Sequence, residues 1–231
     1  MAQSLVDQVY EKIKSEIITC TLAPGQQIAQ PQLAEKFNTG VTPIREALQR
    51  LTQERLVQPI PRFGYIVTPI TLADMSEIFE LRSILESAAA RLAALHASQE
   101  QLDQLAESAS FTYVYKDHES YTHFLEHNTS FHQAVAIASG NHRLAEQISQ
   151  LLDELTRVFH LGLDLKDSAE EMRMEHQELT AALRQRDPAQ AEQIVQAQIT
   201  RSRQRVIEAL LSVGSKRGAA ALGQAVQVSP S

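Results

Sequence analysis

The chain has 231 residues and a net charge of −7; 43% of its residues are apolar, 5% are aromatic, and the only cysteine is Cys20. This composition excludes a disulfide framework and a cysteine-based zinc site, and its wealth of Leu and Ala favours helices. The N-terminus lacks a signal-peptide pattern and no stretch approaches the about 18 apolar residues of a membrane span, so we expect a soluble, cytoplasmic protein.

Three helices are expected in the first part of the chain. Apolar spacing predicts one over residues 5–19, and Pro31 suits the first turn of a short second helix. Thr42 is a plausible N-cap for a third helix, whose first position suits Pro43 and which runs to about Gln53. One face of this third helix is apolar, and it is formed by Ile44, Ala47, Leu48 and Leu51.

Two short strands are expected next, over residues 56–60 and 65–68, and residues 61–64 join them into a hairpin. Three helices followed by a hairpin is the order of a winged helix-turn-helix, a DNA-binding fold. We therefore expect residues 1–70 to form a DNA-binding domain.

From Thr71 onward, strand signals nearly vanish and helical spacing dominates. Six helices are predicted, over residues 72–96, 99–116, 119–138, 142–163, 168–186 and 188–213. Their short connections indicate antiparallel neighbours in a bundle. We therefore expect a mainly α protein with an all-helical domain at 71–213 and a disordered tail at 214–231.

Several motifs occur at a specific spacing. In the first part they are Leu22-Ala23-Pro24-Gly25, Leu33-Ala34-Glu35-Lys36-Phe37, the run from Thr42-Pro43-Ile44-Arg45-Glu46 to Leu51, and Gly64-Tyr65-Ile66-Val67. In the second part they are Leu81-Arg82 with Glu86, Asn128 with Phe131-His132, and His176 with Ala181-Ala182-Leu183. Residues 5–68 resemble the GntR family of winged-helix regulators, and the rest is similar to its FadR subfamily, with the helical effector domain called FCD.

The resemblance implies that the third helix enters the major groove and that the hairpin lies along the DNA backbone or the minor groove. Arg45 is the first candidate for a base contact, because an Arg–guanine pair is the commonest specific contact. The DNA-contacting candidates are Thr42, Arg45, Gln49, Arg50, Arg62 and Gly64. Pro31 and Gly40-Val41 stand where family members usually carry arginines, so the family's typical operator is not expected here.

The acidic net charge does not exclude this role. Residues 1–70 carry seven basic and six acidic residues, whereas residues 71–231 carry fourteen basic and twenty-two acidic ones. Contact with phosphates is local, so a near-neutral module attached to an acidic body can bind DNA. The resemblance implies a homodimer, which would read two half-sites of a roughly palindromic double-stranded operator.

The resemblance also implies an effector site, because many FCD domains hold a divalent metal with an organic acid bound to it. The family's ligands are an Asp and a His one turn apart, then two further His. The matching positions here are Asn128, His132, His176 and Gln198. Two amides replace an Asp and a His, and a neutral amide is a poor ligand for zinc or nickel.

Two alternatives follow for these four residues. Either a divalent metal (zinc or nickel) binds them weakly, or they bind the effector, a small organic acid, directly. Without a metal, Arg82 and Arg201 are the candidates for the carboxylate, because a guanidinium fork matches its two oxygens. Glu86 is expected to pair with Arg82 at the i, i+4 spacing.

Other functions remain as alternatives: a helical metalloenzyme or a metal sensor. A di-iron enzyme needs Glu-x-x-His on two helices, and no Glu in this chain has His three residues later. A Gly-rich phosphate loop and a nucleophile elbow are also missing. A metal sensor is disfavoured by the amides of Asn128 and Gln198. We therefore expect a ligand-responsive DNA-binding regulator and not an enzyme.

Overall fold

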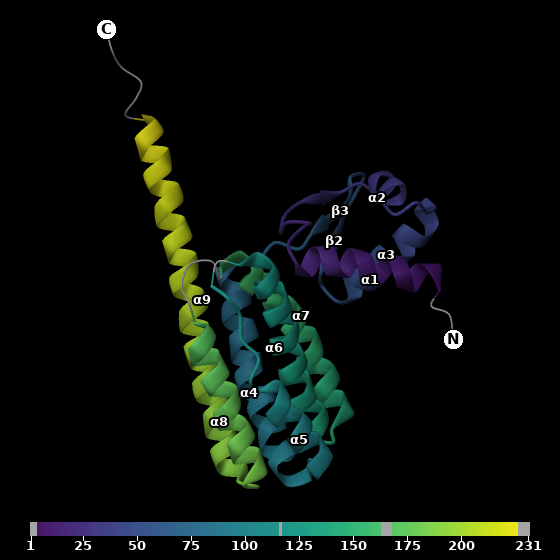
Figure 1. The fold of residues 1–231 in the computed structure, drawn as a ribbon. Coiled ribbons are helices and arrows are strands. Elements are labelled where there is room, and N and C mark those ends of the chain that lie inside the picture. Colours follow the sequence, from purple (N-terminus) through teal and green to yellow (C-terminus); the bar gives the residue numbers. More distant parts are fainter. Residues whose placement is uncertain (1–3, 116, 163–167, 226–231) are drawn as a thin grey trace. The chain divides into compact units, whose positions relative to one another are not determined.

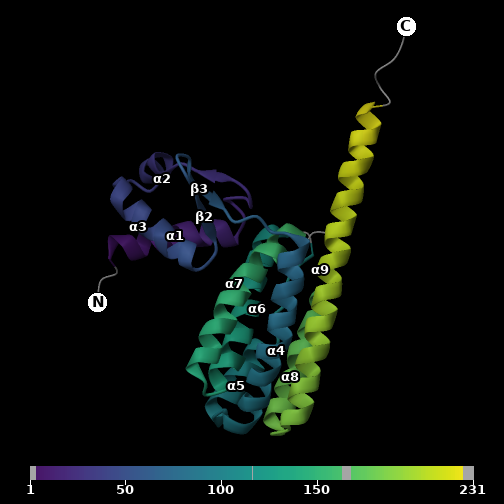
Figure 2. The same ribbon diagram turned by 180° about the vertical axis from the view of Figure 1, so that it is seen from behind.

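The computed structural model describes residues 4–115, 117–162 and 168–225. The chain divides into two compact units, one of Met1–Glu80 with Glu146–His160 and the other of Leu81–Ala145 with Leu161–Ser231. Figures 1 and 2 show the elements of both units from opposite sides. The expected fold class is confirmed, because helices dominate and the only sheet among the described residues is small.

In the first unit, α1 (Leu5–Ile18) begins with a capping box. The Ser4 hydroxyl accepts from the Asp7 backbone nitrogen at 3.1 Å, and the Asp7 carboxylate accepts from the Ser4 nitrogen at 3.3 Å. These two bonds satisfy donors that a helix start otherwise leaves open. The buried side of α1 carries Val9, Tyr10, Ile13 and Ile17.

Helices α2 (Gln30–Lys36) and α3 (Val41–Gln53) follow, with Pro31 in the first turn of α2 as expected. The N-cap of α3 is Gly40 rather than Thr42, so that prediction is wrong. Gly40 has an extended backbone and the helix begins directly after it, which places Thr42 within the first turn, beyond the capping position. The predicted apolar face of α3 is confirmed, because all four of its residues are fully buried.

The sheet has three strands in the order β1-β3-β2, and both pairs are antiparallel. The predicted hairpin is present as β2 (Val57–Ile60) and β3 (Gly64–Val67). A third strand, β1 (Gln27–Ile28), was not predicted; it pairs with β3 through Gln27–Ile66 and Ile28–Tyr65. Two residues are too short to display the alternation that predicts a strand.

The close packing of this sheet explains why residue 64 is a glycine. Its φ is +91°, and a Cβ at this position would lie 3.0 Å from the Ile28 carbonyl oxygen. Gly64 thus lets β3 approach β1 closely, in a backbone conformation that other residues adopt only with strain.

Replacing Gly64 by alanine is therefore expected to lower the free energy of unfolding by about 1–3 kcal/mol. Urea unfolding followed by circular dichroism measures this loss. Gly25→Ala is the matched control, because Gly25 has a φ of +81° but a Cβ added there would meet no atom within 4 Å. Equal losses in the two variants would show that the contact with Ile28 contributes nothing.

All six helices predicted for the second part of the chain are present. They are α4 (Leu72–His96), α5 (Gln99–Ser108), α6 (His118–Ala138), α7 (His142–Gly162), α8 (Ala169–Arg184) and α9 (Pro188–Ala225). No helix among the described residues combines the length and the apolar character needed to cross a membrane. Helices α8 and α9 lie side by side in Figures 1 and 2.

Two helix ends differ from the prediction. Helix α5 ends at Ser108, eight residues early, and in the segment after it the ring centre of Tyr113 lies 4.8 Å from those of Tyr121 and Phe124. Helix α9 continues to Ala225, past the expected end at residue 213. Ala219–Leu222 are strong helix formers, and their helix propensity outweighs the small and polar composition from which a disordered tail was expected. Residues 226–231 of that tail lie outside the described residues.

Candidate functional site

The exposed face of α3 carries the first group of candidate residues. Thr42, Arg45 and Gln49 are all exposed, and their spacing of three and four residues places them on one side of the helix. The opposite side is fully buried in the core of the winged helix. These three side chains are therefore available to a DNA groove.

Arg50 has a different environment from these three residues. Its Nη1 lies 2.7 Å from the Asp7 carboxylate, and its guanidinium lies 4.0 Å from the centre of the Tyr10 ring. Both partners belong to α1, so Arg50 links α3 to α1. This arrangement favours a structural role for Arg50 over a base contact.

The turn between β2 and β3 carries the wing candidates. Arg62 is exposed and has a φ of +71°. Gly64 is explained by its close approach to Ile28, so its presence does not depend on DNA. Phe63, which was not predicted as a contact residue, is 70% exposed at the same turn. An aromatic ring left in water at a wing is available to contact a partner.

The second group of candidates lies in the helical unit and is buried. Asn128, His176 and Gln198 are each at most 6% exposed, and they come from α6, α8 and α9 respectively. His132 lies one turn after Asn128, and its ring centre is 5.3 Å from that of His176. The structure thus brings the two predicted histidines together, and we call these four residues the polar cluster.

Two acceptor atoms of the polar cluster are buried without a hydrogen-bond partner among the described residues. They are Asn128 Oδ1 and Gln198 Oε1. The Nε2 of Gln198 donates to the Glu175 carbonyl oxygen and so fixes the orientation of the amide. The Oε1 of the same amide is then the atom that lacks a donor. A buried acceptor without a donor costs free energy, and a ligand that donates hydrogen bonds would recover it.

Arg82 forms the expected pair with Glu86, and this prediction is confirmed. Its Nε lies 2.5 Å from Glu86 Oε1 and its Nη2 lies 3.2 Å from Oε2. The same Oε2 is 3.2 Å from His132 Nδ1, so Glu86 also orients the histidine. Burial by itself would raise the pKa of Glu86, but Arg82 and His132 together outweigh it and lower this pKa to about 2.

This arrangement changes the role open to Arg82. Both Arg82 and Glu86 are at most 5% exposed, and the charge of one offsets the charge of the other. An incoming carboxylate would therefore meet a paired guanidinium and not a free cation.

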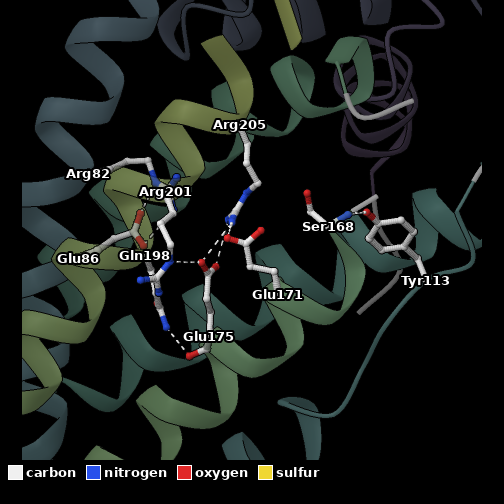
Figure 3. Close-up of polar contacts among 9 residues, drawn as sticks. All are labelled: Arg82, Glu86, Tyr113, Ser168, Glu171, Glu175, Gln198, Arg201 and Arg205. Carbon is white, nitrogen blue, oxygen red and sulfur yellow. Dashed lines mark hydrogen bonds and ion pairs between the residues drawn. The ribbon is translucent and has the colours of Figure 1, made fainter. Parts of the chain in front are cut away.

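Arg201 is likewise paired, with a carboxylate that the sequence analysis missed. Its Nε lies 2.6 Å from Glu175 Oε1. Arg205 holds the same carboxylate with its two terminal nitrogens at 3.2 and 3.1 Å, and also lies 3.1 Å from Glu171 (Figure 3). The sequence did contain a signal for this pairing. Two glutamates lie four residues apart on α8 (Glu171 and Glu175), and two arginines lie four residues apart on α9 (Arg201 and Arg205).

His176 is held in its neutral form. Burial is the main cause that lowers its pKa to about 3, and the nearby His132 and Arg205 lower it further. Its ring is stacked on Phe131 with 4.1 Å between the centres. A neutral imidazole offers one donor and one acceptor, so His176 can bind a polar ligand or a metal.

The polar cluster does not fit a resident zinc or nickel ion. Within the part of the chain that the structure describes, no group of three or more His, Cys, Asp or Glu side chains is placed to hold a metal. The four positions offer two imidazoles and two neutral amides, and the Glu86 carboxylate is already bound to Arg82 and His132. No negative charge is left to offset a divalent cation.

Known proteins resemble this chain over both units. The description "Bacterial regulatory proteins, gntR family" matches residues 5–67, and "FCD domain" matches residues 77–201. The transcriptional repressor RspR of Escherichia coli K12 is 26% identical over 80% of this chain and 81% of its own length. The repressor GlaR of the same strain is 28% identical over 80% of this chain and 88% of its own length.

Two solved structures share the fold. E. coli McbR/YncC superposes with a TM-score of 0.77 at 24% identity and covers 90% of this chain and 99% of its own. A putative GntR regulator from Rhodococcus sp. RHA1 has a TM-score of 0.75 at 21% identity, with the same coverage. All these proteins are named as regulators or share their fold, and none is named as an enzyme.

Proposed function

This chain belongs to the GntR family of transcription regulators and carries an FCD domain, and we propose that it binds operator DNA under the control of a small organic acid. DNA binding is assigned to residues 1–70 and effector binding to residues 71–213. The protein would act in the cytoplasm, where its DNA is. The enzyme and metal-sensor alternatives have no support in the comparisons.

The DNA-binding proposal is carried by the exposed face of α3. Thr42, Arg45 and Gln49 are exposed on the third helix of a winged helix, the element that enters the major groove in this fold. The wing would add Arg62 and the exposed ring of Phe63 to this surface.

The polar cluster supports the effector proposal, in which the effector binds these four residues directly and no metal takes part. Asn128 Oδ1 and Gln198 Oε1 are acceptors without partners, which a hydroxyl or amine of the effector would satisfy. The carboxylate of the effector needs a donor. Both candidate arginines are paired with a carboxylate, but Arg201, which Glu175 holds, is 41% exposed and suits this role better than Arg82, which is only 3% exposed. A hydroxylated or aminated organic acid offers both kinds of group.

The regulator is proposed to act as a homodimer, because a winged helix of this kind reads one half-site and two copies read a palindrome. The effector would change DNA binding by favouring one arrangement of the dimer. This requires that the effector binds two arrangements with different affinities.

Replacing Arg45 by alanine is expected to weaken operator binding by about 10- to 100-fold, the equivalent of a lost Arg–guanine pair of about 1–3 kcal/mol. The operator is first selected from random duplex DNA with the wild-type protein. Affinity is then measured by fluorescence anisotropy at one fixed salt concentration, because salt alone changes it strongly. Failure of the wild type to enrich any sequence would overturn the proposal.

Arg50→Ala is the matched control, since it removes the same charge from the same helix. Arg50 is engaged by Asp7 and Tyr10, so this variant should lose some stability and bind the operator within a few-fold of the wild type. An equal loss of affinity in both variants would show that α3 contributes only general positive charge.

A further inference from the structure

An ion cluster joins α8 to α9 beside the polar cluster. It consists of Glu171 and Glu175 on α8 and of Arg201 and Arg205 on α9 (Figure 3). Glu175 connects both arginines, because its carboxylate accepts from Arg201 Nε at 2.6 Å and from the two terminal nitrogens of Arg205 at 3.2 and 3.1 Å. A carboxylate of the chain itself thus occupies donors of two arginines. We call these four residues the ion cluster.

The ion cluster and the polar cluster are directly connected. Glu175 immediately precedes His176, and the Nε2 of Gln198 donates to the Glu175 carbonyl oxygen. Arg201 follows Gln198 by three residues, so these two side chains lie on one side of α9. A small ligand that donates a hydrogen bond to Gln198 Oε1 would therefore have its other groups near the arginines that Glu175 holds.

The charges of the ion cluster offset one another, with two glutamates and two arginines. A free carboxylate that approaches Arg201 brings its charge beside that of Glu175, and like charges repel. The approach itself is open, because the Arg201 side chain is 41% exposed. Water is also within reach of Glu175, because Glu171 lies one turn away on α8 and is 45% exposed. A free carboxylate therefore binds here most favourably when the Glu175 carboxylate moves out into water.

We propose that Glu175 is an internal competitor of the effector. Its carboxylate occupies Arg201 and Arg205 in the effector-free protein, and the carboxylate of the effector takes its place. This inference rests on the effector site of the proposed function and adds what determines the affinity of that site. The exchange keeps both guanidinium groups paired but removes the contact that Glu175 makes between α8 and α9. Occupancy of the site thereby changes how two helices are held together.

Chemical rescue in the full chain tests whether the two arginines accept a free carboxylate. Glu175→Ala removes the heavy atoms of one acetate ion from the ion cluster. Acetate at several times its dissociation constant is expected to raise the melting temperature of this variant by about 2–4 °C relative to chloride at the same ionic strength. The wild type should show no such rise, because Glu175 already fills the position. Circular dichroism measures both melts.

Glu170→Ala is the matched control on the same helix. Glu170 is likewise held by an arginine, with its carboxylate 2.5 Å from Arg173, but its side chain is 68% exposed. Water solvates such a pair, so acetate should not stabilise this variant. An equal rise in Glu170→Ala or in the wild type would overturn the exchange, because acetate would then act independently of Glu175. The absence of a rise in a folded Glu175→Ala would overturn it as well.

Glu175→Gln keeps the shape of the side chain and removes its charge, so it tests the exchange even if Glu175→Ala does not fold. Calorimetric titration with glycolate, the smallest hydroxy acid, is expected to show binding at least about tenfold tighter than in the wild type. The double variant E175Q/R201M should lose this gain, because it lacks the exposed guanidinium. Equal affinity in the wild type and Glu175→Gln, or no binding by Glu175→Gln, would overturn the competition.

These outcomes are distinguishable from a failure of the proposed function. A wild type that selects no operator would overturn the DNA-binding regulator and leave the exchange standing, because the melts and titrations need no DNA. Glycolate that binds equally well with and without the Glu175 charge would overturn the exchange and leave an effector site standing.

Discussion

Replacing Glu86 by alanine is expected to lower the free energy of unfolding by about 3–5 kcal/mol, the cost of breaking a buried ion pair. Glu86 is the carboxylate that offsets Arg82 and orients His132, at 2.5 Å and 3.2 Å. Its removal leaves the guanidinium charge of Arg82 in a site that is 3% exposed. Urea unfolding of the full chain at neutral pH measures the loss.

Two further variants identify the cause of this loss. Glu86→Gln keeps the shape but not the charge, so it should lose nearly as much as alanine. The double variant R82M/E86L replaces the pair by apolar side chains and should recover most of the stability, because neither buried charge remains. A double variant as unstable as Glu86→Ala would show that packing or His132 matters more than the unpaired charge.

The pH dependence gives an independent check. The folded pKa of Glu86 is lowered from 4.5 to about 2, so its ionised form stabilises the fold. This contribution is fully present above about pH 4.5 and is lost as the pH falls toward 2. The stability difference between the wild type and Glu86→Gln should therefore shrink over this range, and a constant difference would contradict the assignment.

The double substitution N128D/Q198H is expected to convert the polar cluster into a metal site. It gives the polar cluster an Asp, a His pair that already lies 5.3 Å apart, and a third His. A site of three imidazoles and one carboxylate is a normal zinc site. Metal at about 100 times its dissociation constant should stabilise this variant by about 2.7 kcal/mol.

Metal content after purification and thermal melts before and after chelation measure this effect. The wild type should contain little metal and its melt should not change with chelation. His176→Phe in the double variant removes a ligand and should abolish the stabilisation. Near-stoichiometric metal in the wild type, lost with a fall in its melting temperature, would show that the amides of Asn128 and Gln198 serve as ligands.

Local spacing in the sequence determined much of the fold. The predicted apolar face of α3 is fully buried, and the six predicted helices of the second part are present, four of them with both ends within two residues of the prediction. This success has a simple cause, because helical periodicity depends on residues three and four apart. The same rule identified the Arg82–Glu86 pair, whose partners lie on one helix.

Where local spacing carried little information, the prediction failed. Strand β1 has only two residues and exists because β3 provides its hydrogen bonds. Helix α5 ends at Ser108, and Tyr113 in the segment after it packs against Tyr121 and Phe124, on another helix. Neither neighbour can be identified from the residues around Tyr113.

The candidate effector site also has features that could be predicted and features that could not. The resemblance to a known family indicated the four residues of the polar cluster, and their neighbours Arg82 and Arg201 were candidates for the carboxylate. The packing of α8 against α9 brings Glu175 to Arg201 and Arg205, and this contact offsets the charge of a predicted anion site. The physical reason is that residues on one helix meet through its fixed geometry, whereas residues on two helices meet only when packing sets their rotation and register.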